Sequence, residues 1–163
     1  MSAAPKEKTM PPMPWIILGS DHAGYRIKRF IEGLLVAKCY RVEDVGTWST
    51  ASVDYPDFAE KLALRVRGGR GRRGILTCGT GIGASIAANK VPGIRAALVC
   101  NVRDARLSIE HNNANVLVLG GRPFDRALAR RIVDAWLKAS FQGGRHLRRI
   151  RKITAIENRF LSS

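Results

Sequence analysis

The sequence predicts a single α/β domain with a doubly wound, five-stranded parallel sheet of Rossmann-like type, helices on both of its faces and a further helix at the C-terminus. Short apolar segments alternate with amphipathic ones five times along the chain, which is the pattern of repeated strand–helix units. The short segments are continuously apolar and rich in β-branched residues, as in parallel strands covered on both faces. Crossovers between such strands are right-handed, which gives a doubly wound sandwich. With 163 residues, 45% of them hydrophobic, the chain is long enough to bury one such core.

The first unit begins with Trp15–Gly19, an apolar run that ends in glycine and predicts a strand. Asp21 is expected to cap the helix that follows. Apolar residues recur at helical spacing from Ile27 to Leu35, which predicts the body of that helix. Tyr40–Val45 is the second predicted strand.

The middle of the chain predicts two more helices around a central strand. Asp54–Val66 is a helical segment, and Pro56 fits its first turn because proline lacks an amide hydrogen that the first turn does not use. Gly74–Cys78 is a short apolar run and predicts the third strand. Ser85–Lys90 is expected to form a short helix that stops before Pro92.

The last third of the chain completes the alternation. Ile94–Cys100 and Asn115–Leu119 are apolar runs of strand length, and Arg103–Glu110 between them has helical spacing. Phe124–Lys138 and His146–Phe160 are expected to be two closing helices.

Residues 1–14 are predicted to be a disordered tail, because four of these fourteen residues are proline. The tail lacks the apolar segment of a secretory signal, and the three cysteines show no paired spacing. Both observations favour a reducing compartment, so we expect the protein in the cytoplasm. No apolar run approaches the roughly 20 residues of a membrane span. The folded domain is expected to occupy residues 15–163.

Ligands of doubly wound sheets bind beyond the carboxyl ends of the strands. The segments expected at that edge are Gly19–Gly24, Gly46–Trp48, Cys78–Gly83, Cys100–Arg103 and Gly120–Arg122.

Cys78–Ser85 is the most informative of these segments, because a strand ends at a cysteine and glycine then occupies every second position. Successive backbone amides in such a turn can surround an anion at the start of a helix. The spacing is neither the dinucleotide-binding fingerprint nor a P-loop, and a tight turn beside a buried cysteine explains it equally well. If Cys78 is functional, the helix terminus is expected to lower its thiol pKa and make it a general base. Cys39 and Cys100 are interpreted as packing residues.

Histidines stand in two polar loops. Asp21 and His22 are adjacent in the loop after the first strand, either as a helix cap and a surface residue or as ligand contacts. The loop His111–Asn115 is either a polar turn with a left-handed asparagine or the position of an acid–base histidine.

Basic residues give the chain a formal charge of +15, which predicts an anionic partner. Arg145 and Arg149 are four residues apart on a predicted helix, so they form either a phosphate clamp or part of a solvated basic face. Five arginines within Arg65–Arg73 raise the alternative of a nucleic-acid-binding protein. That segment contains no aromatic residue, and no known RNA-binding signature is present, so nucleic-acid binding is expected to be weak and non-specific.

Taken in order along the chain, these motifs resemble the ribose-5-phosphate isomerase B family, which also contains the galactose-6-phosphate isomerase subunits and allose-6-phosphate isomerase activity. The matching segments are GSDHAG at Gly19–Gly24, DVGTWS at Asp44–Ser49, DYP at Asp54–Pro56, CGTGIGASIAANKVPGIRAAL at Cys78–Leu98, ARLSIEHNNANVLVLGGR at Ala105–Arg122, and DAWL, GGRH and ITAIE within Asp134–Glu157. The resemblance extends from Trp15 to Phe160.

The resemblance implies an aldose–ketose isomerase of sugar phosphates that needs neither metal nor cofactor and forms a homodimer or tetramer with its active site at the dimer interface. It implies catalytic roles for Cys78 as the base, Thr80 as a proton shuttle between hydroxyls, and His111 in ring opening. The implied substrate-binding residues are Asp21, His22, Gly79, Gly81, Ile82, Gly83, Asn112, Arg122, Arg145 and Arg149.

The expected substrate is ribose 5-phosphate, converted to ribulose 5-phosphate in the pentose phosphate pathway. The alternative substrates are the hexose 6-phosphates of allose and galactose, because the segment Cys100–Asp104 departs from the family pattern near the expected substrate entrance. Gly68–Gly74 is also far more basic than the corresponding turn of the family, and the sequence assigns it no role.

Overall fold

The computed structural model describes residues 14–161 of the chain. Its centre is a five-stranded, all-parallel sheet, as the sequence predicted, and the strand order is β2-β1-β3-β5-β4. The strands are β1 (Trp15–Ser20), β2 (Arg41–Asp44), β3 (Arg73–Cys78), β4 (Ala96–Leu98) and β5 (Val116–Gly120). β3 lies in the middle of the sheet, so its carboxyl end is flanked by strands on both sides.

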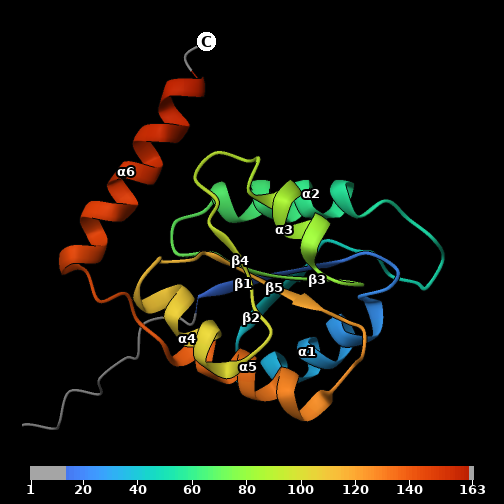
Figure 1. The fold of residues 1–163 in the computed structure, drawn as a ribbon. Coiled ribbons are helices and arrows are strands. Elements are labelled where there is room, and N and C mark those ends of the chain that lie inside the picture. Colours follow the sequence, from blue (N-terminus) through green and yellow to red (C-terminus); the bar gives the residue numbers. More distant parts are fainter. Residues whose placement is uncertain (1–13, 162–163) are drawn as a thin grey trace, which may run out of the picture.

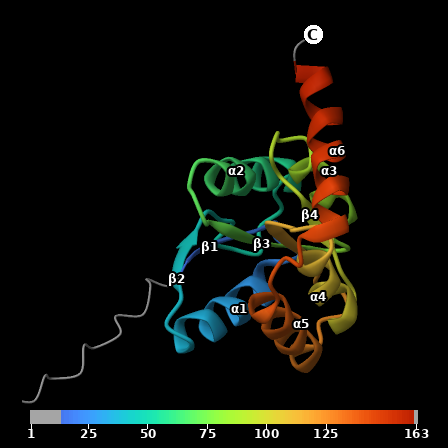
Figure 2. The ribbon, with the colours of Figure 1, turned by 90° about the vertical axis from the view of Figure 1, so that its left-hand side faces the viewer.

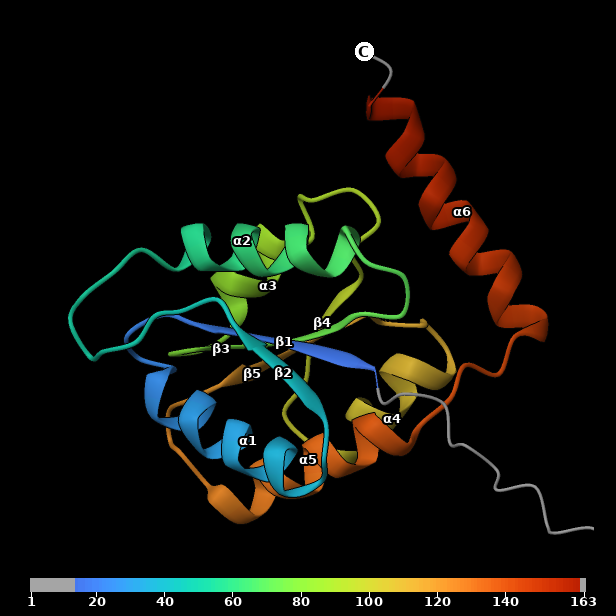
Figure 3. The same cartoon turned by 180° about the vertical axis from the view of Figure 1, so that it is seen from behind.

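Helices cover both faces of the sheet (Figure 1). The helices on one face are α1 (Tyr25–Ala37), α4 (Val102–Glu110) and α5 (Arg126–Lys138), and those on the other are α2 (Tyr55–Arg67) and α3 (Ile82–Ala88). The last helix, α6 (Gly144–Leu161), projects away from these layers, as Figures 2 and 3 show from two further sides. Only His146 and Ile150 of α6 are buried.

Two hydrophobic cores hold the layers together. On the α1–α4–α5 face, Ile31, Ile132 and Trp136 pack on the sheet with little or no exposed surface. On the α2–α3 face the sheet packs against Leu62 and a set of alanines, so the short helix α3 lies close to the strands. Each fully buried aliphatic side chain of these cores contributes roughly 1.5–3 kcal/mol to folding.

Some boundaries differ from the predicted ones for local reasons. β4 is shorter than Ile94–Cys100, because it pairs with β5 alone at the sheet edge, over Ala96–Leu98 only. α3 begins at Ile82 rather than Ser85. Asp21 is not the N-cap of α1 as predicted; Gly24 is, and the Asp21 carboxylate accepts the Gly24 amide at 2.8 Å.

Cys39 and Cys100 are exposed, so their interpretation as packing residues is wrong. The predicted disordered tail falls on residues 1–14, of which 1–13 lie outside the described residues. Within residues 14–161, no helix combines the length and the apolar character needed to cross a membrane.

Candidate active site

Sheet register brings Asp21 and Cys78 together. Ser20 at the end of β1 pairs with Thr77 on β3, and the next residue of each strand is Asp21 and Cys78. The Cys78 thiol donates a hydrogen bond to Asp21 Oδ2 at 2.9 Å, and both side chains are buried. A nucleophilic side chain and a carboxylate therefore meet at the carboxyl edge of the central strands, where the sequence placed the site.

The pKa of the Cys78 thiol is raised above its ordinary value, which contradicts the expected lowering by the helix terminus. Burial is the largest cause, and the hydrogen bond to Asp21 and the negative charge of Asp21 add to it. The backbone amides of Gly81 and Gly79 oppose the rise without reversing it. The free protein therefore holds a thiol whose proton points at a carboxylate.

The glycine-rich segment after Cys78 forms a turn in which backbone replaces side chains. Gly81 is the N-cap of α3 and has a φ of 80°, a conformation that favours glycine. A Cβ atom at Gly81 would lie 2.6 Å from the Leu98 side chain, and one at Gly83 would lie 2.5 Å from the Tyr55 ring. Thr80 is exposed at the tip of the turn, and its hydroxyl accepts the Ile82 amide at 3.3 Å. The backbone amides of Gly79 and Gly81 thus face the sulfur of Cys78.

His22 and Arg122 lie beside this turn and share a cavity of about 360 Å³ with Arg26 of α1. The Arg122 amide donates to the Gly79 carbonyl at 3.2 Å, which ties the segment after β5 to the glycine turn. His22 Nδ1 lies 3.2 Å from both the amide and the carbonyl of Val53, which holds the ring beside the cavity. Arg26 is a cation of this cavity that the sequence reasoning missed.

A buried ion pair between Lys28 and Asp44 fixes the backbone next to the site. Lys28 has no exposed surface, and its ammonium lies 2.6 and 2.7 Å from the two oxygens of Asp44 and 2.6 Å from the Thr47 carbonyl. Desolvation lowers the pKa of Lys28, and the contact with Asp44 partly offsets this. Thr47 in turn donates its amide to the Ser20 carbonyl at 2.7 Å, directly before Asp21. Lys28 therefore positions the strand end that carries Asp21.

The other predicted site residues form a second cluster. His111 follows the last residue of α4, and its ring stacks on that of His146 with centroids 4.2 Å apart and an interplanar angle of 9°. Burial lowers the pKa of His146, and the nearby charges of His111, Arg145 and Arg149 lower it further. His111 and the two arginines therefore all lie near His146. His146 is missing from the predicted set, although it directly follows Arg145.

The two clusters lie at opposite edges of the sheet. Cys78 pairs with Gly120 at the carboxyl ends of β3 and β5, whereas His111 lies five residues before Val116, where β5 begins. β5 itself is five residues long and spans about 16 Å. His111 lies before its start and Cys78 lies beside its end, so one chain does not bring its own His111 to its own Cys78. We call Asp21, His22, Cys78, Thr80 and Arg122 the carboxyl-edge cluster. We call His111, Asn112, Arg145, His146 and Arg149 the amino-edge cluster.

Comparison with known proteins shows the family of the chain. The family model described as Ribose/Galactose Isomerase matches residues 16–153. The chain belongs to the ribose/galactose isomerase family. It is 50% identical to ribose-5-phosphate isomerase B of Escherichia coli over 147 residues, which cover 90% of this chain and 99% of that protein. The family resemblance is thus confirmed, and the protein is an isomerase.

Solved structures of the family share the fold. Ribose-5-phosphate isomerase B of Clostridium thermocellum has a TM-score of 0.88 at 55% identity, covering 90% of this chain and 99% of that one. The enzyme of Mycoplasma genitalium with bound ribulose-5-phosphate has a TM-score of 0.85 at 44% identity, covering 90% of this chain and 98% of that one.

No group of three or more histidine, cysteine or acidic side chains in residues 14–161 is arranged to hold a metal ion. The chemical groups that the two clusters do offer are a thiol, a carboxylate, imidazoles, guanidinium groups and backbone amides.

Proposed function

We propose that the protein interconverts ribose 5-phosphate and ribulose 5-phosphate through an enediolate, with Cys78 as the base. The observation that carries the proposal is the Cys78 thiol, 2.9 Å from the Asp21 carboxylate beside a turn of backbone amides. The relatives named above support the choice of a pentose phosphate, and one of them holds ribulose-5-phosphate.

In the proposed chemistry, Asp21 first accepts the thiol proton of Cys78. The thiolate removes the proton from C2 of the open-chain aldose, and the electron pair moves toward the carbonyl to form the enediolate. The same sulfur returns that proton to C1, while the Thr80 hydroxyl passes a proton between the two substrate oxygens. Asp21 then gives its proton back to the sulfur, so the enzyme ends as it began.

The glycine turn supplies the stabilisation that this step needs. Negative charge grows on two oxygens, and the amides of the turn from Gly79 to Gly83 are the proposed donors, of which those of Gly79 and Gly81 interact with the Cys78 sulfur. Each preorganised donor of this kind is worth about 3–4 kcal/mol of transition-state stabilisation. Backbone amides supply it without reorganisation, because the turn is fixed by Gly81 and by the start of α3.

The amino-edge cluster supplies a group for opening the sugar ring and further groups for binding the phosphate. A pentose phosphate is mainly cyclic, so an acid–base group must open the ring, and His111 is the candidate. Arg145 and Arg149 would bind the phosphate with His22 and Arg122, and so anchor the substrate away from the reacting carbons. These groups reach one substrate only if the amino-edge cluster of one chain meets the carboxyl-edge cluster of another.

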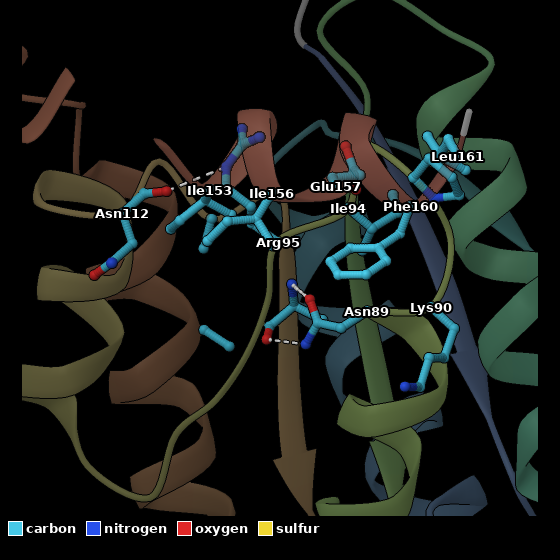
Figure 4. Close-up of a pocket in the computed structure, with 14 residues that line it drawn as sticks. Asn89, Lys90, Ile94, Arg95, Asn112, Ile153, Ile156, Glu157, Phe160 and Leu161 are labelled. Atoms are coloured by element: carbon cyan, nitrogen blue, oxygen red, sulfur yellow. Dashed lines mark hydrogen bonds between the residues drawn. The ribbon is translucent and has the colours of Figure 1, made fainter. Parts of the chain in front are cut away.

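We therefore propose a homodimer with two composite sites. The helix α6 carries Arg145 and Arg149 at its start and an apolar face at its end. That face, formed by Ile153, Ile156, Phe160 and Leu161, lines a groove of about 760 Å³ together with Ile94 (Figure 4). Phe160 is 78% exposed, which is costly in water and favours burial against a second copy.

All three cysteines are free thiols, which supports our further proposal of a cytoplasmic protein.

Mixing two inactive variants tests the composite site. Cys78→Ala and His111→Ala chains are co-expressed with different affinity tags, and the mixed dimers are assayed for ribulose 5-phosphate formation. Each variant alone is expected to be inactive, while the purified mixed dimers recover about half of the wild-type rate, because each of them contains one intact site of two. Mixed dimers that stay inactive would show that both residues act within one chain.

A further inference from the structure

A second basic cavity lies at the amino-terminal edge of the sheet, away from Cys78. It has a volume of about 560 Å³ and is lined by residues of the α2 end, the turn before β3, the α4–β5 turn and the segment after α5. Four arginines line it, Arg67, Arg72, Arg73 and Arg95, and none of the lining residues is acidic. We call it the arginine groove. Three of the four arginines belong to the basic segment for which the isomerase reaction has no use.

Arg73 is fixed in the wall of the groove as a partly desolvated cation. Its guanidinium lies 3.7 Å from the centroid of the Trp136 ring, and one Nη donates to the Trp136 carbonyl at 2.7 Å. Burial lowers the pKa of Arg73 to about 10. Arg73 forms no ion pair with a carboxylate of residues 14–161. A cation held in this way is stabilised by an anionic ligand.

Arg95, in the segment before β4, lines both this groove and the apolar groove beside α6. Its Nε donates to the carbonyls of Asn112 and Asn113 at 3.2 and 2.9 Å, which fixes the plane of the guanidinium. Burial also lowers the pKa of Arg95, although the charge of Glu157 partly offsets this. Arg73 and Arg95 are thus each held in place by backbone carbonyls, so little ordering of these two side chains is needed when a ligand binds.

Arg67 and Arg72 add two cations at the rim. Arg72 folds back over the turn, where its Nη1 donates to the Arg65 carbonyl at 3.1 Å. A Cβ atom at Gly69 would overlap the Arg72 side chain, so glycine at this position lets the arginine lie across the turn. Apolar surface from Ile109 and Phe141 completes the groove.

We propose that the arginine groove binds a small metabolite that carries at least two phosphates. Four guanidinium groups match the oxygens of a diphosphate or of two separate phosphates, because arginine pairs with phosphate in a bidentate manner. The volume is that of a small-molecule site. A nucleoside diphosphate and a sugar bisphosphate share the required chemistry, and only the former would place a base on Phe141. A nucleic-acid strand fits less well, since Phe141 is the only aromatic residue that lines the groove.

Calorimetric titration at physiological salt tests the proposal with pyrophosphate, ADP and ribose 1,5-bisphosphate as probes. The double variant Arg67→Ala/Arg72→Ala removes two rim cations whose loss leaves both cores intact. Arg70→Ala is the matched control, because Arg70 lies in the same segment but does not line the groove. At least one probe is expected to bind once per chain, more than about tenfold weaker in the double variant and unchanged in the control. Tighter binding of ADP than of the other probes would identify a nucleotide, and tighter binding of ribose 1,5-bisphosphate a sugar bisphosphate.

Four results would overturn the proposal. One is the absence of binding by every probe, and another is equal weakening by Arg70→Ala, which would reduce the effect to general charge attraction. The third is displacement of the probe by ribose 5-phosphate from Cys78→Ala protein, which would place the anion in the substrate site. The fourth is tighter binding of a single-stranded 20-nucleotide DNA than of all three probes, which would show that the groove binds nucleic acid and not a small metabolite. Binding is measured without turnover, so the result does not depend on the proposed isomerase reaction.

Discussion

Replacing Lys28 by methionine tests how much the buried ion pair with Asp44 contributes to the free energy of unfolding. The ammonium of Lys28 is fully buried and makes three short hydrogen bonds, two to Asp44 and one to the Thr47 carbonyl, at 2.6 to 2.7 Å. Removing one partner of a buried ion pair costs about 3–5 kcal/mol. The Asp44 side chain is 14% exposed and keeps the Gly46 amide at 2.9 Å, so we expect the lower end. The predicted loss of unfolding free energy for Lys28→Met is therefore about 3 kcal/mol.

Urea denaturation followed by circular dichroism measures this loss, with Lys38→Met as the control. Lys38 pairs with Asp134 at 3.1 Å but is 38% exposed, so its removal is expected to cost less than about 1 kcal/mol. The double variant Lys28→Met/Asp44→Asn removes the stranded charge and should recover part of the loss. The reasoning fails if Lys28→Met is no more destabilising than Lys38→Met, or if the double variant is less stable than Lys28→Met.

The remaining predictions concern the site itself. Because the Cys78 pKa is raised and the proposed mechanism starts from the thiol, whose proton passes to Asp21, kcat/KM should stay level from neutrality to above pH 8; a rate that rises about tenfold per pH unit over this range would mean that the thiol must first lose its proton to solvent, which contradicts the role of Asp21. Asp21→Asn removes the negative charge that raises this pKa and leaves only a neutral acceptor for the thiol, so alkylation of Cys78 by iodoacetamide, followed in a Cys39→Ser/Cys100→Ser background, should begin at lower pH; an unchanged profile would show that the charge of Asp21 does not set the pKa. Gly24→Ala places a Cβ atom against the Thr77 carbonyl, where backbone cannot move aside, and should cost about 3 kcal/mol or more in urea denaturation, whereas Gly79→Ala meets only the Ala23 methyl at 3.5 Å and should leave stability nearly unchanged; equal losses would refute this packing argument. Arg149→Ala should raise KM for ribose 5-phosphate by about tenfold or more with little change in Arg148→Ala, and equal effects of the two would reduce the clamp to a general positive charge.

The fold follows from the sequence because its signals are local. Apolar runs such as Trp15–Gly19 and Gly74–Cys78 form strands with nearly the predicted bounds, and glycine or proline marks where elements end. Strand order is not a local property, and neither is the short length of β4, which depends on its place at the edge of the sheet. The left-handed asparagine weighed for the loop after α4 is present at Asn113, with a φ of 47°.

Site chemistry was less predictable, because it depends on contacts between distant segments. The helix terminus beside Cys78 suggested a lowered pKa, but the decisive neighbour is Asp21, which is 57 positions away and comes close only through the register of β1 and β3. Nothing in the sequence indicated that Lys28 is buried, since a lysine on an amphipathic helix is normally solvated. Asp44 becomes its partner only in the folded sheet. His146 could have been found from its place between Arg145 and Arg149 on one helix. The opposite placement of Cys78 and His111 follows from the direction of β5, which the strand assignment already contained.

The central claim is tested most directly by turnover of ribose 5-phosphate to ribulose 5-phosphate, measured for the wild type and for Cys78→Ala with EDTA present. Allose 6-phosphate and galactose 6-phosphate are assayed in parallel, and circular dichroism confirms that the variant is folded. We predict turnover of the pentose phosphate that is abolished in folded Cys78→Ala. Retention of the wild-type rate by the variant would remove Cys78 from the mechanism, and wild-type protein that is inactive on the pentose would contradict the proposed substrate.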